Sequence, residues 1–179
     1  MKGPMMRAAP PTMMQSSPTF DVRSLAGVSA PLGFFDPLGF TTGASEGRVK
    51  FLRECEIKHS RVAMLAALGF VAGEFVPGSV PSVVAFQESG VPASAFILLV
   101  GLPEIFSIFT FNSPFGGEIF SIRKDYANGN FDFDPLGLKP TDKAALKEMQ
   151  TKELNNGRLA MIAWAGMASQ ELVHNSKLF

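Results

Sequence analysis

The sequence ELNNGRLAM (residues 153–161) has a counterpart, EIKHSRVAM (residues 56–64), 97 residues earlier in the chain. Aligned without gaps, residues 56–76 and 153–173 share eight of 21 positions: Glu, Arg, Ala, Met, Ala, Gly, Glu and Val. A repeat that served only a hydrophobic core would keep apolar spacing, whereas this one keeps a carboxylate, a basic residue and small residues. We therefore expect two equivalent helices that carry equivalent polar residues.

A second repeat, FDPLG, begins about twenty residues before each of these segments, at Phe35–Gly39 and Phe133–Gly137. Asp-Pro is a turn signal, and Gly- and Pro-rich sequence surrounds the first copy and Gly-, Asn-, Pro- and Asp-rich sequence the second. The repeated unit is therefore a loop followed by a helix, and the chain contains it twice.

The composition favours apolar surroundings. Charged residues make up 18% of the chain, against a typical ~25%, and there are 17 Phe but only one Tyr and one Trp. Such side chains suit a buried or membrane setting, or flat apolar ligands. A net charge of zero gives no argument for a nucleic-acid partner, and a single Cys excludes an internal disulfide and a Cys-based metal site.

The first seventeen residues differ from the rest. They contain five of the nine Met, two basic residues, three Pro and no acidic residue. This composition resembles the remnant of an organelle transit segment, and a disordered arm of the mature protein is the equal alternative. We expect residues 18–179 to form a single domain.

Capping residues, apolar runs and Pro or Gly breaks predict three helices, at about residues 46–76, 92–111 and 142–173. The middle one is the plainest apolar run and is near the ~20 residues that a membrane span needs. The first helix is charged in its first half, and Val62–Gly73 is only twelve uncharged residues. A soluble three-helix bundle is therefore an alternative to a membrane protein.

Two features favour the membrane protein. The middle segment is apolar on all faces, which a soluble three-helix bundle cannot bury. Basic residues gather before the first and third helices, while residues 77–91 contain no Lys or Arg, which is a positive-inside pattern. We therefore predict an all-α membrane protein with three transmembrane helices and its N-terminus on the cytosol-equivalent face.

With one span between them, the first and third helices run in the same direction, so a pseudo-two-fold axis along the membrane normal can relate them as a crossed pair. Small residues allow close helix crossing, and the repeat offers them at equivalent positions: Ala63, Ala66, Gly69, Ala160, Ala163 and Gly166.

The charged residues of the repeat predict two ion pairs between these helices. Glu56 and Arg61 lie five residues apart, roughly 140° around the helix, so they do not face each other. The same holds for Glu153 and Arg158, and an unpaired charge inside a membrane is costly. The two-fold relation instead pairs Glu56 with Arg158 and Glu153 with Arg61. Each carboxylate would then keep a spare oxygen.

His59 and Asn156 add further lone pairs, each three residues after a repeated Glu, and Gln170 follows Asn156 by fourteen residues, close to four helical turns. One isolated N or O ligand does not suit a bare zinc ion, which needs three or four converging ligands. It suits a metal that a macrocycle already holds, and Mg²⁺ accepts a carboxylate, an amide oxygen or an imidazole.

The motifs Glu56-x-x-His59-x-Arg61 and Glu153-x-x-Asn156-x-Arg158-Leu-Ala-Met resemble the first and third membrane helices of the light-harvesting chlorophyll-binding family. The stretch APLGFFDPLGF (residues 30–40) is similar to the entry loop of its chlorophyll a/c branch, the fucoxanthin or peridinin antennas. The middle helix matches only in kind.

The resemblance implies magnesium ligands and carotenoid contacts. The implied chlorophyll ligands are Glu56, His59, Glu153, Asn156 and Gln170. Glu104 is a further candidate because it is an acidic residue in the apolar middle helix without an obvious Arg partner. Gln170 could instead bond a neighbouring helix, and His174, at a helix end, is as easily a solvated or capping residue as a ligand. The two turns would hold the polar end groups of two carotenoids through Phe35, Asp36, Pro37, Leu38, Phe133, Asp134, Pro135 and Leu136.

The function implied is that of a light-harvesting antenna subunit, not an enzyme, in the plastid thylakoid membrane with its N-terminus on the stromal side. The implied cofactors are chlorophyll a, chlorophyll c and carotenoids of the fucoxanthin or peridinin/diadinoxanthin type. Other antenna subunits, a photosystem core and thylakoid lipids are the expected partners, and no nucleic acid. A photoprotective quencher of the same family and a pigment-free membrane interaction protein are the alternatives.

Overall fold

The computed structural model describes residues 20–75, 94, 98, 101, 104, 120–131, 134–174 and 176. In chain order they form a 3₁₀ turn, η1 (Val22–Ser24), and two long helices, α1 (Glu46–Glu74) and α4 (Lys143–His174). An isolated β bridge joins Ser29 and Gly33. The described part of the chain is therefore helical, with long loops before each helix.

Both helices begin at capping residues that satisfy their free N–H groups. Ser45 Oγ accepts a hydrogen bond from the Arg48 amide at 3.2 Å, and Asp142 Oδ2 accepts one from the Ala145 amide at 3.0 Å. Helix α1 ends at Glu74, before the Val76 limit predicted from the sequence. The Pro77-Gly78 break expected to stop it lies outside the described residues.

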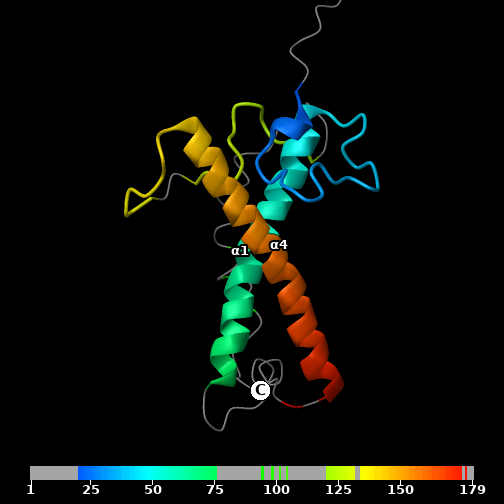
Figure 1. Ribbon diagram of the computed structural model, residues 1–179, viewed down its shortest axis with the longest axis vertical. Helices are drawn as coiled ribbons and strands as arrows, with labels where there is room; N and C mark the ends of the chain where they lie inside the picture. The colour runs from blue at the N-terminus through cyan, green and yellow to red at the C-terminus, as the bar shows by residue number, and fades with distance from the viewer. Residues whose placement is uncertain are drawn as a thin grey trace, which may run out of the picture.

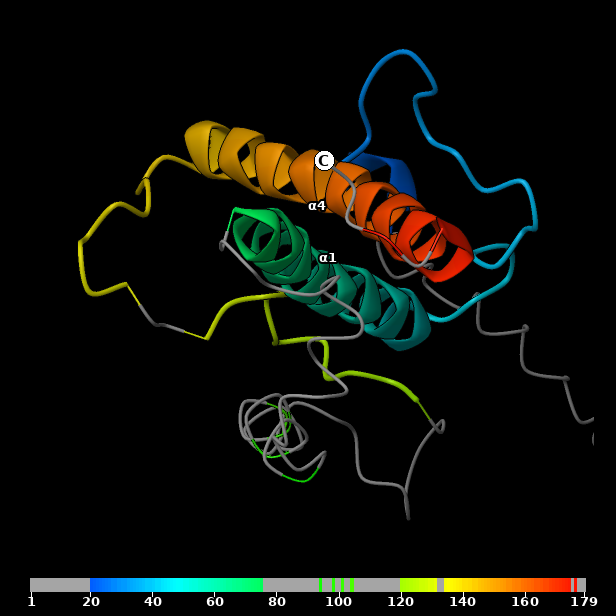
Figure 2. The same ribbon diagram turned by 90° about the horizontal axis from the view of Figure 1, so that it is seen from below.

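Helices α1 and α4 run in the same direction and cross as an X, and both loops lie at the end where the helices begin (Figure 1). Seen along the pair, the loop before α1 and the loop before α4 lie on opposite sides (Figure 2). At the crossing, a Cβ atom added to Gly157 would lie 2.2 Å from Ser60 Cβ. These two residues are 97 positions apart, so they are equivalent in the repeat.

The small residues predicted to form the crossing do so only in part. Ala63 is buried, but Gly69 and Gly166 have no described atom within 4 Å of an added Cβ. The close approach expected at these small residues is therefore not seen at Gly69 and Gly166. The helices touch one turn earlier, at Ser60 and Gly157, and then diverge (Figure 1).

Little of the middle segment is described. Of the helix predicted at 92–111, Ser94, Leu98, Gly101 and Glu104 are described, and each is helical. Across the described part of the chain, none of the helices combines the length and apolar character needed to cross a membrane.

Candidate functional site

Two ion pairs join α1 to α4 at the crossing. Arg61 Nε lies 2.8 Å from Glu153 Oε1, and Arg158 Nε lies 2.8 Å from Glu56 Oε1. These are the two pairs that the repeat predicts. Charge-assisted hydrogen bonds of this length are roughly twice as strong as neutral ones, so each pair ties one helix to the other.

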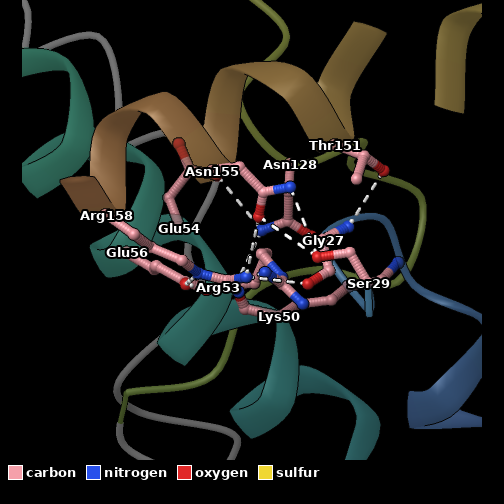
Figure 3. Close-up of polar contacts among 10 residues, drawn as sticks. All are labelled: Gly27, Ser29, Lys50, Arg53, Glu54, Glu56, Asn128, Thr151, Asn155 and Arg158. Carbon is pink, nitrogen blue, oxygen red and sulfur yellow. Dashed lines mark hydrogen bonds and ion pairs between the residues drawn. The ribbon is translucent and has the colours of Figure 1, made fainter. Parts of the chain in front are cut away.

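The same two arginines also hold the loops. Arg61 Nη2 donates to the Gly129 carbonyl at 2.9 Å. Arg158 Nη1 donates to the Gly27 carbonyl at 2.7 Å (Figure 3). Both glycines have positive φ, 71° and 86°, a conformation that residues with a Cβ rarely adopt. A Cβ at Gly27 would also meet Leu154, and one at Gly129 would meet Ile57, each within 3.2 Å.

The amide groups of these glycines donate hydrogen bonds to side chains at a second pair of equivalent positions in the repeat. The Gly129 amide donates to Glu54 Oε2 at 2.9 Å. The Gly27 amide donates to Thr151 Oγ1 at 3.1 Å (Figure 3). Glu54 and Thr151 are 97 residues apart. The pseudo-two-fold relation therefore extends from the helices to the loops. Sequence reasoning missed it because the equivalent side chains, Glu and Thr, differ.

Glu54 is a buried carboxylate, only 2% exposed. Besides the Gly129 amide, its oxygens accept from Asn128 Nδ2 at 3.1 Å and from the Tyr126 hydroxyl at 3.4 Å. Asn128 Nδ2 also donates to the Lys50 carbonyl at 2.7 Å. A buried charge needs such partners, so Glu54 fastens residues 126–129 to α1.

The two ion pairs differ in one respect. Glu56 Oε2 accepts from Arg53 Nη1 at 2.7 Å (Figure 3), so both oxygens of this carboxylate have a guanidinium partner. Arg53 can reach because residues three apart lie on one helix face. The expectation that each carboxylate keeps a spare oxygen therefore differs from the structure at Glu56. In α4, Gln150 occupies the position equivalent to Arg53.

The two FDPLG turns have the same hydrogen bonds. Asp36 accepts from the amides of Phe40 and Thr41 at 3.0 and 2.9 Å. Asp134 accepts from the amides four and five residues later at the same distances, 3.0 and 2.9 Å. Hydrogen bonding lowers the pKa of both carboxyls, chiefly from Thr41 at Asp36 and from the Lys139 amide at Asp134. The remaining predicted turn residues are exposed where described, Leu38 and Leu136 by 76% and 77%, while Phe133 lies outside the described residues.

The predicted ligands outside the ion pairs lie on exposed helix surface. His59 is exposed, and its Nδ1 lies 2.7 Å from the Cys55 carbonyl, which leaves Nε2 directed away from the backbone. His174 Nδ1 lies 3.1 Å from the Gln170 carbonyl in the same way. The Asn156 and Gln170 side chains are also exposed.

Glu104 has a partner that the sequence did not suggest. Its Oε2 lies 2.5 Å from Lys58 Nζ of α1. Lys58 and Glu104 lie 46 positions apart on separate segments, so helical periodicity could not predict that they pair. The ion pair places Glu104 of the middle segment beside α1.

Each ion pair borders a cavity. A cavity of about 560 Å³ between the first loop and α1 is lined by Glu56 and Arg158, among others. A second cavity, of about 610 Å³, lies by the other loop and is lined by Glu153 and Arg61. Large apolar side chains are exposed beyond the crossing on both helices: Leu65, Leu68, Leu159 and Ile162.

These residues fit a flat, apolar cofactor with a central metal. The donors are isolated carboxylate, imidazole and amide groups, each beside exposed apolar side chains, and no three metal-binding side chains cluster among the described residues. A metal held by four ring nitrogens needs one further donor, so isolated donors suffice.

Comparison with known proteins identifies the family. Residues 22–172 match the family model described as chlorophyll A-B binding protein. The chain is 46% identical over 171 residues to light-harvesting complex stress-related protein 3.2 of Chlamydomonas reinhardtii, covering 88% of this chain and 66% of that protein. It is 40% identical over 161 residues to a fucoxanthin-chlorophyll a-c binding protein of Isochrysis galbana, covering 83% and 76%.

The chain thus spans slightly less than two thirds of the length of the stress-related relative. The predicted family is confirmed by the family model and by both kinds of relative, whose names place them in the chloroplast. From its repeated helices and loops, its crossed ion pairs and these matches, the chain belongs to the light-harvesting chlorophyll a-b binding family.

Proposed function

We propose that this chain is a light-harvesting antenna subunit that binds chlorophylls and carotenoids and passes excitation energy to a photosystem. The observation that carries the proposal is the pair of Glu–Arg contacts, each beside a cavity and related by the repeat. Such a symmetric arrangement positions two equivalent carboxylates at fixed separation. The family is a pigment-binding one, and we assign no bond chemistry to the chain.

The chain's own residues would hold and orient the pigments. Chlorophyll, when bound, supplies light absorption and excitation transfer. Glu153 Oε2 faces no described partner and would act as a magnesium ligand, and His59 Nε2 would act as another. The remaining proposed ligands are Glu56, Asn156, Gln170 and Glu104, with His174 as a further candidate.

The two FDPLG turns are proposed to hold carotenoid end groups. Each turn is fixed by the Asp36 or Asp134 carboxylate, which also lines the adjacent cavity, and each turn presents an exposed Leu. Carotenoids of the fucoxanthin or diadinoxanthin type and chlorophyll c are proposed because some relatives are named fucoxanthin-chlorophyll a-c binding proteins.

The proposed setting is the thylakoid membrane. Residues 18–179 would form one pigment-binding domain with three transmembrane helices, at about 46–76, 92–111 and 142–173, and with the N-terminus on the stromal side. Residues 1–17 would be a transit remnant or a disordered arm. Other antenna subunits, a photosystem core and thylakoid lipids are the proposed partners.

A photoprotective role is the second candidate, and the comparisons favour it specifically. The stress-related relatives are 44–46% identical to the chain, and the fucoxanthin-chlorophyll relatives are 31–40% identical. In that role the same pigments would release excitation as heat. The fold serves both roles equally, because both require pigments at fixed distances.

The test is reconstitution of the purified chain with a thylakoid pigment extract. Pigment binding predicts a green monomer with chlorophyll and carotenoid absorption, and a colourless protein would contradict both roles. The fluorescence lifetime of the green monomer then separates them. A lifetime close to that of chlorophyll in detergent indicates harvesting, and a strongly shortened one indicates quenching.

A further inference from the structure

The two symmetry-related carboxylates are not equally available to a metal. Glu56 accepts from Arg158 at Oε1 and from Arg53 at Oε2, at 2.8 and 2.7 Å. Glu153 accepts from Arg61 at Oε1, at 2.8 Å, and no described residue donates to its Oε2. One carboxylate therefore has both oxygens engaged, while its counterpart has one oxygen open.

A single residue of the repeat accounts for this difference. Arg53 lies three positions before Glu56, and Gln150 lies three positions before Glu153. The group around Glu56 consists of two guanidinium ions and one carboxylate, with a local charge of +1. The group around Glu153 has one of each, with a local charge of zero.

Arg53 is held inside the site. Its side chain is 14% exposed, and its Nη1 lies 3.2 Å from the position that a Cβ of Gly27 would take. Arg53 also lines both cavities. A surface arginine would be screened by water, whereas this one acts on Glu56 at close range.

Each charge-assisted hydrogen bond occupies a lone pair and draws electron density from the carboxylate, and the excess positive charge repels Mg²⁺. We propose that Arg53 makes Glu56 the weaker of the two repeated magnesium ligands, so that the chlorophyll at Glu56 is released before the chlorophyll at Glu153. This inference rests on the proposed pigment-binding function.

The test compares four reconstituted proteins: wild type, Arg53→Gln, Arg53→Lys and Gln150→Arg. Increasing detergent removes pigments stepwise, and the absorption difference at each step records which band is lost. Wild type should lose one chlorophyll early. Arg53→Gln, which makes the first site match the second, should retain this chlorophyll on the order of tenfold more tightly, the size expected for one hydrogen bond to a charged group.

The two other variants are the controls. Arg53→Lys keeps the positive charge and should keep the early loss. Gln150→Arg places the guanidinium three residues before Glu153 and should create a second early loss with a different absorption band. A reciprocal result of this kind would not arise from general destabilisation.

The direction in which Arg53→Gln changes chlorophyll retention separates this role from a purely structural one. If Arg53 only holds Glu56 in place, Arg53→Gln will lose its chlorophyll sooner, and the inference fails. It also fails if the order of release is the same in all four proteins, although the proposed function then stands. A wild type that binds no chlorophyll would overturn both.

Discussion

Ser60 and Gly157 occupy equivalent positions of the repeat and contact each other where α1 crosses α4. Ser60 is 1% exposed, and a Cβ at Gly157 would lie 2.2 Å from its Cβ and 3.0 Å from its Cα. Two equivalent residues can meet only on a two-fold axis. The pseudo-two-fold axis of the molecule therefore passes between them, and the ion pairs and loop contacts are arranged about this point.

Gly157→Ala should weaken the assembled protein more than an ordinary overpacked core residue, which costs about 1–3 kcal/mol. The added methyl group would meet the backbone of α1 as well as a side chain, so the helices must separate. The measurement is the yield and thermal stability of the reconstituted green monomer.

Gly166→Ala is the matched control, since no described atom lies within 4 Å of its added Cβ. Exchanging the two residues across the axis, as Ser60→Gly with Gly157→Ser, should recover most of the lost stability. Equal damage from Gly157→Ala and Gly166→Ala would place the crossing elsewhere.

Glu54→Ala should loosen the loop before α4. It removes the acceptor of the Gly129 amide and one of the two acceptors of Asn128 Nδ2, which keeps the Lys50 carbonyl, so one partly buried amide is left unpaired at a cost of about 1–3 kcal/mol. Thr151→Ala, at the equivalent position, removes one neutral hydrogen bond to Gly27 and should cost about 1 kcal/mol. Thermal melting of the green monomer measures both, and a larger loss in Thr151→Ala would contradict the assignment.

His59→Leu should remove about one chlorophyll and leave the fold intact. The His59 side chain is exposed, and its described hydrogen bond runs from Nδ1 to the carbonyl of Cys55 one turn earlier. Pigment extraction and chromatography measure the chlorophyll to carotenoid ratio. An unchanged ratio would show that Nε2 is not a magnesium ligand.

The FDPLG turns should be insensitive to pH between 5 and 8. Hydrogen bonds lower the pKa of Asp36 and Asp134 below the ordinary 3.8, so the folded turns bind protons less readily than the unfolded chain. The stability that these two carboxylates contribute is fully present above a pH of about 3.8, and it is lost as the pH falls through their lowered pKa values. Infrared titration of the carboxylate stretch, with Asp36→Asn and Asp134→Asn to assign the bands, checks this. Protonation of either carboxyl between pH 5 and 8 would contradict it.

The sequence predicted the features of the site that the repeat preserves as identical residues. Glu56, Arg61, Glu153 and Arg158 are kept in both halves, and their five-residue spacing excludes pairing within a helix. The cross-helix pairs therefore followed from periodicity alone. Helix starts followed from capping chemistry in the same way.

Contacts between unlike residues could not be predicted. Glu54 and Thr151 make equivalent hydrogen bonds with different side chains, and Gln150 is the counterpart of Arg53. A repeat recognised from identical residues does not reveal such positions. The pairing of Lys58 with Glu104 depends on how a separate segment packs against α1. Such packing is decided by the whole fold and leaves no periodic trace.

The Arg61–Glu153 pair allows the clearest test of the two-fold pigment-binding core. Arg158→Leu still leaves Glu56 with Arg53, so no charge is stranded and its effect should be smaller than that of Arg61→Leu. Arg61→Leu leaves Glu153 without a described partner. Both side chains of this pair are 34% exposed, so the cost should lie between the ~1 kcal/mol of an exposed pair and the ~3–5 kcal/mol of a broken buried one.

The decisive measurement is the yield of green monomer after pigment reconstitution of Arg61→Leu alone and combined with Glu153→Gln or with Glu56→Gln. Arg61→Leu should lower the yield sharply. Adding Glu153→Gln should restore it in part, because the stranded charge is removed and the amide oxygen can still bind magnesium. Adding Glu56→Gln should not, because Glu56 lies on the same helix as Arg61 and pairs with other arginines. Equal recovery by both double variants would contradict the cross-helix pairing, and with it the symmetric core.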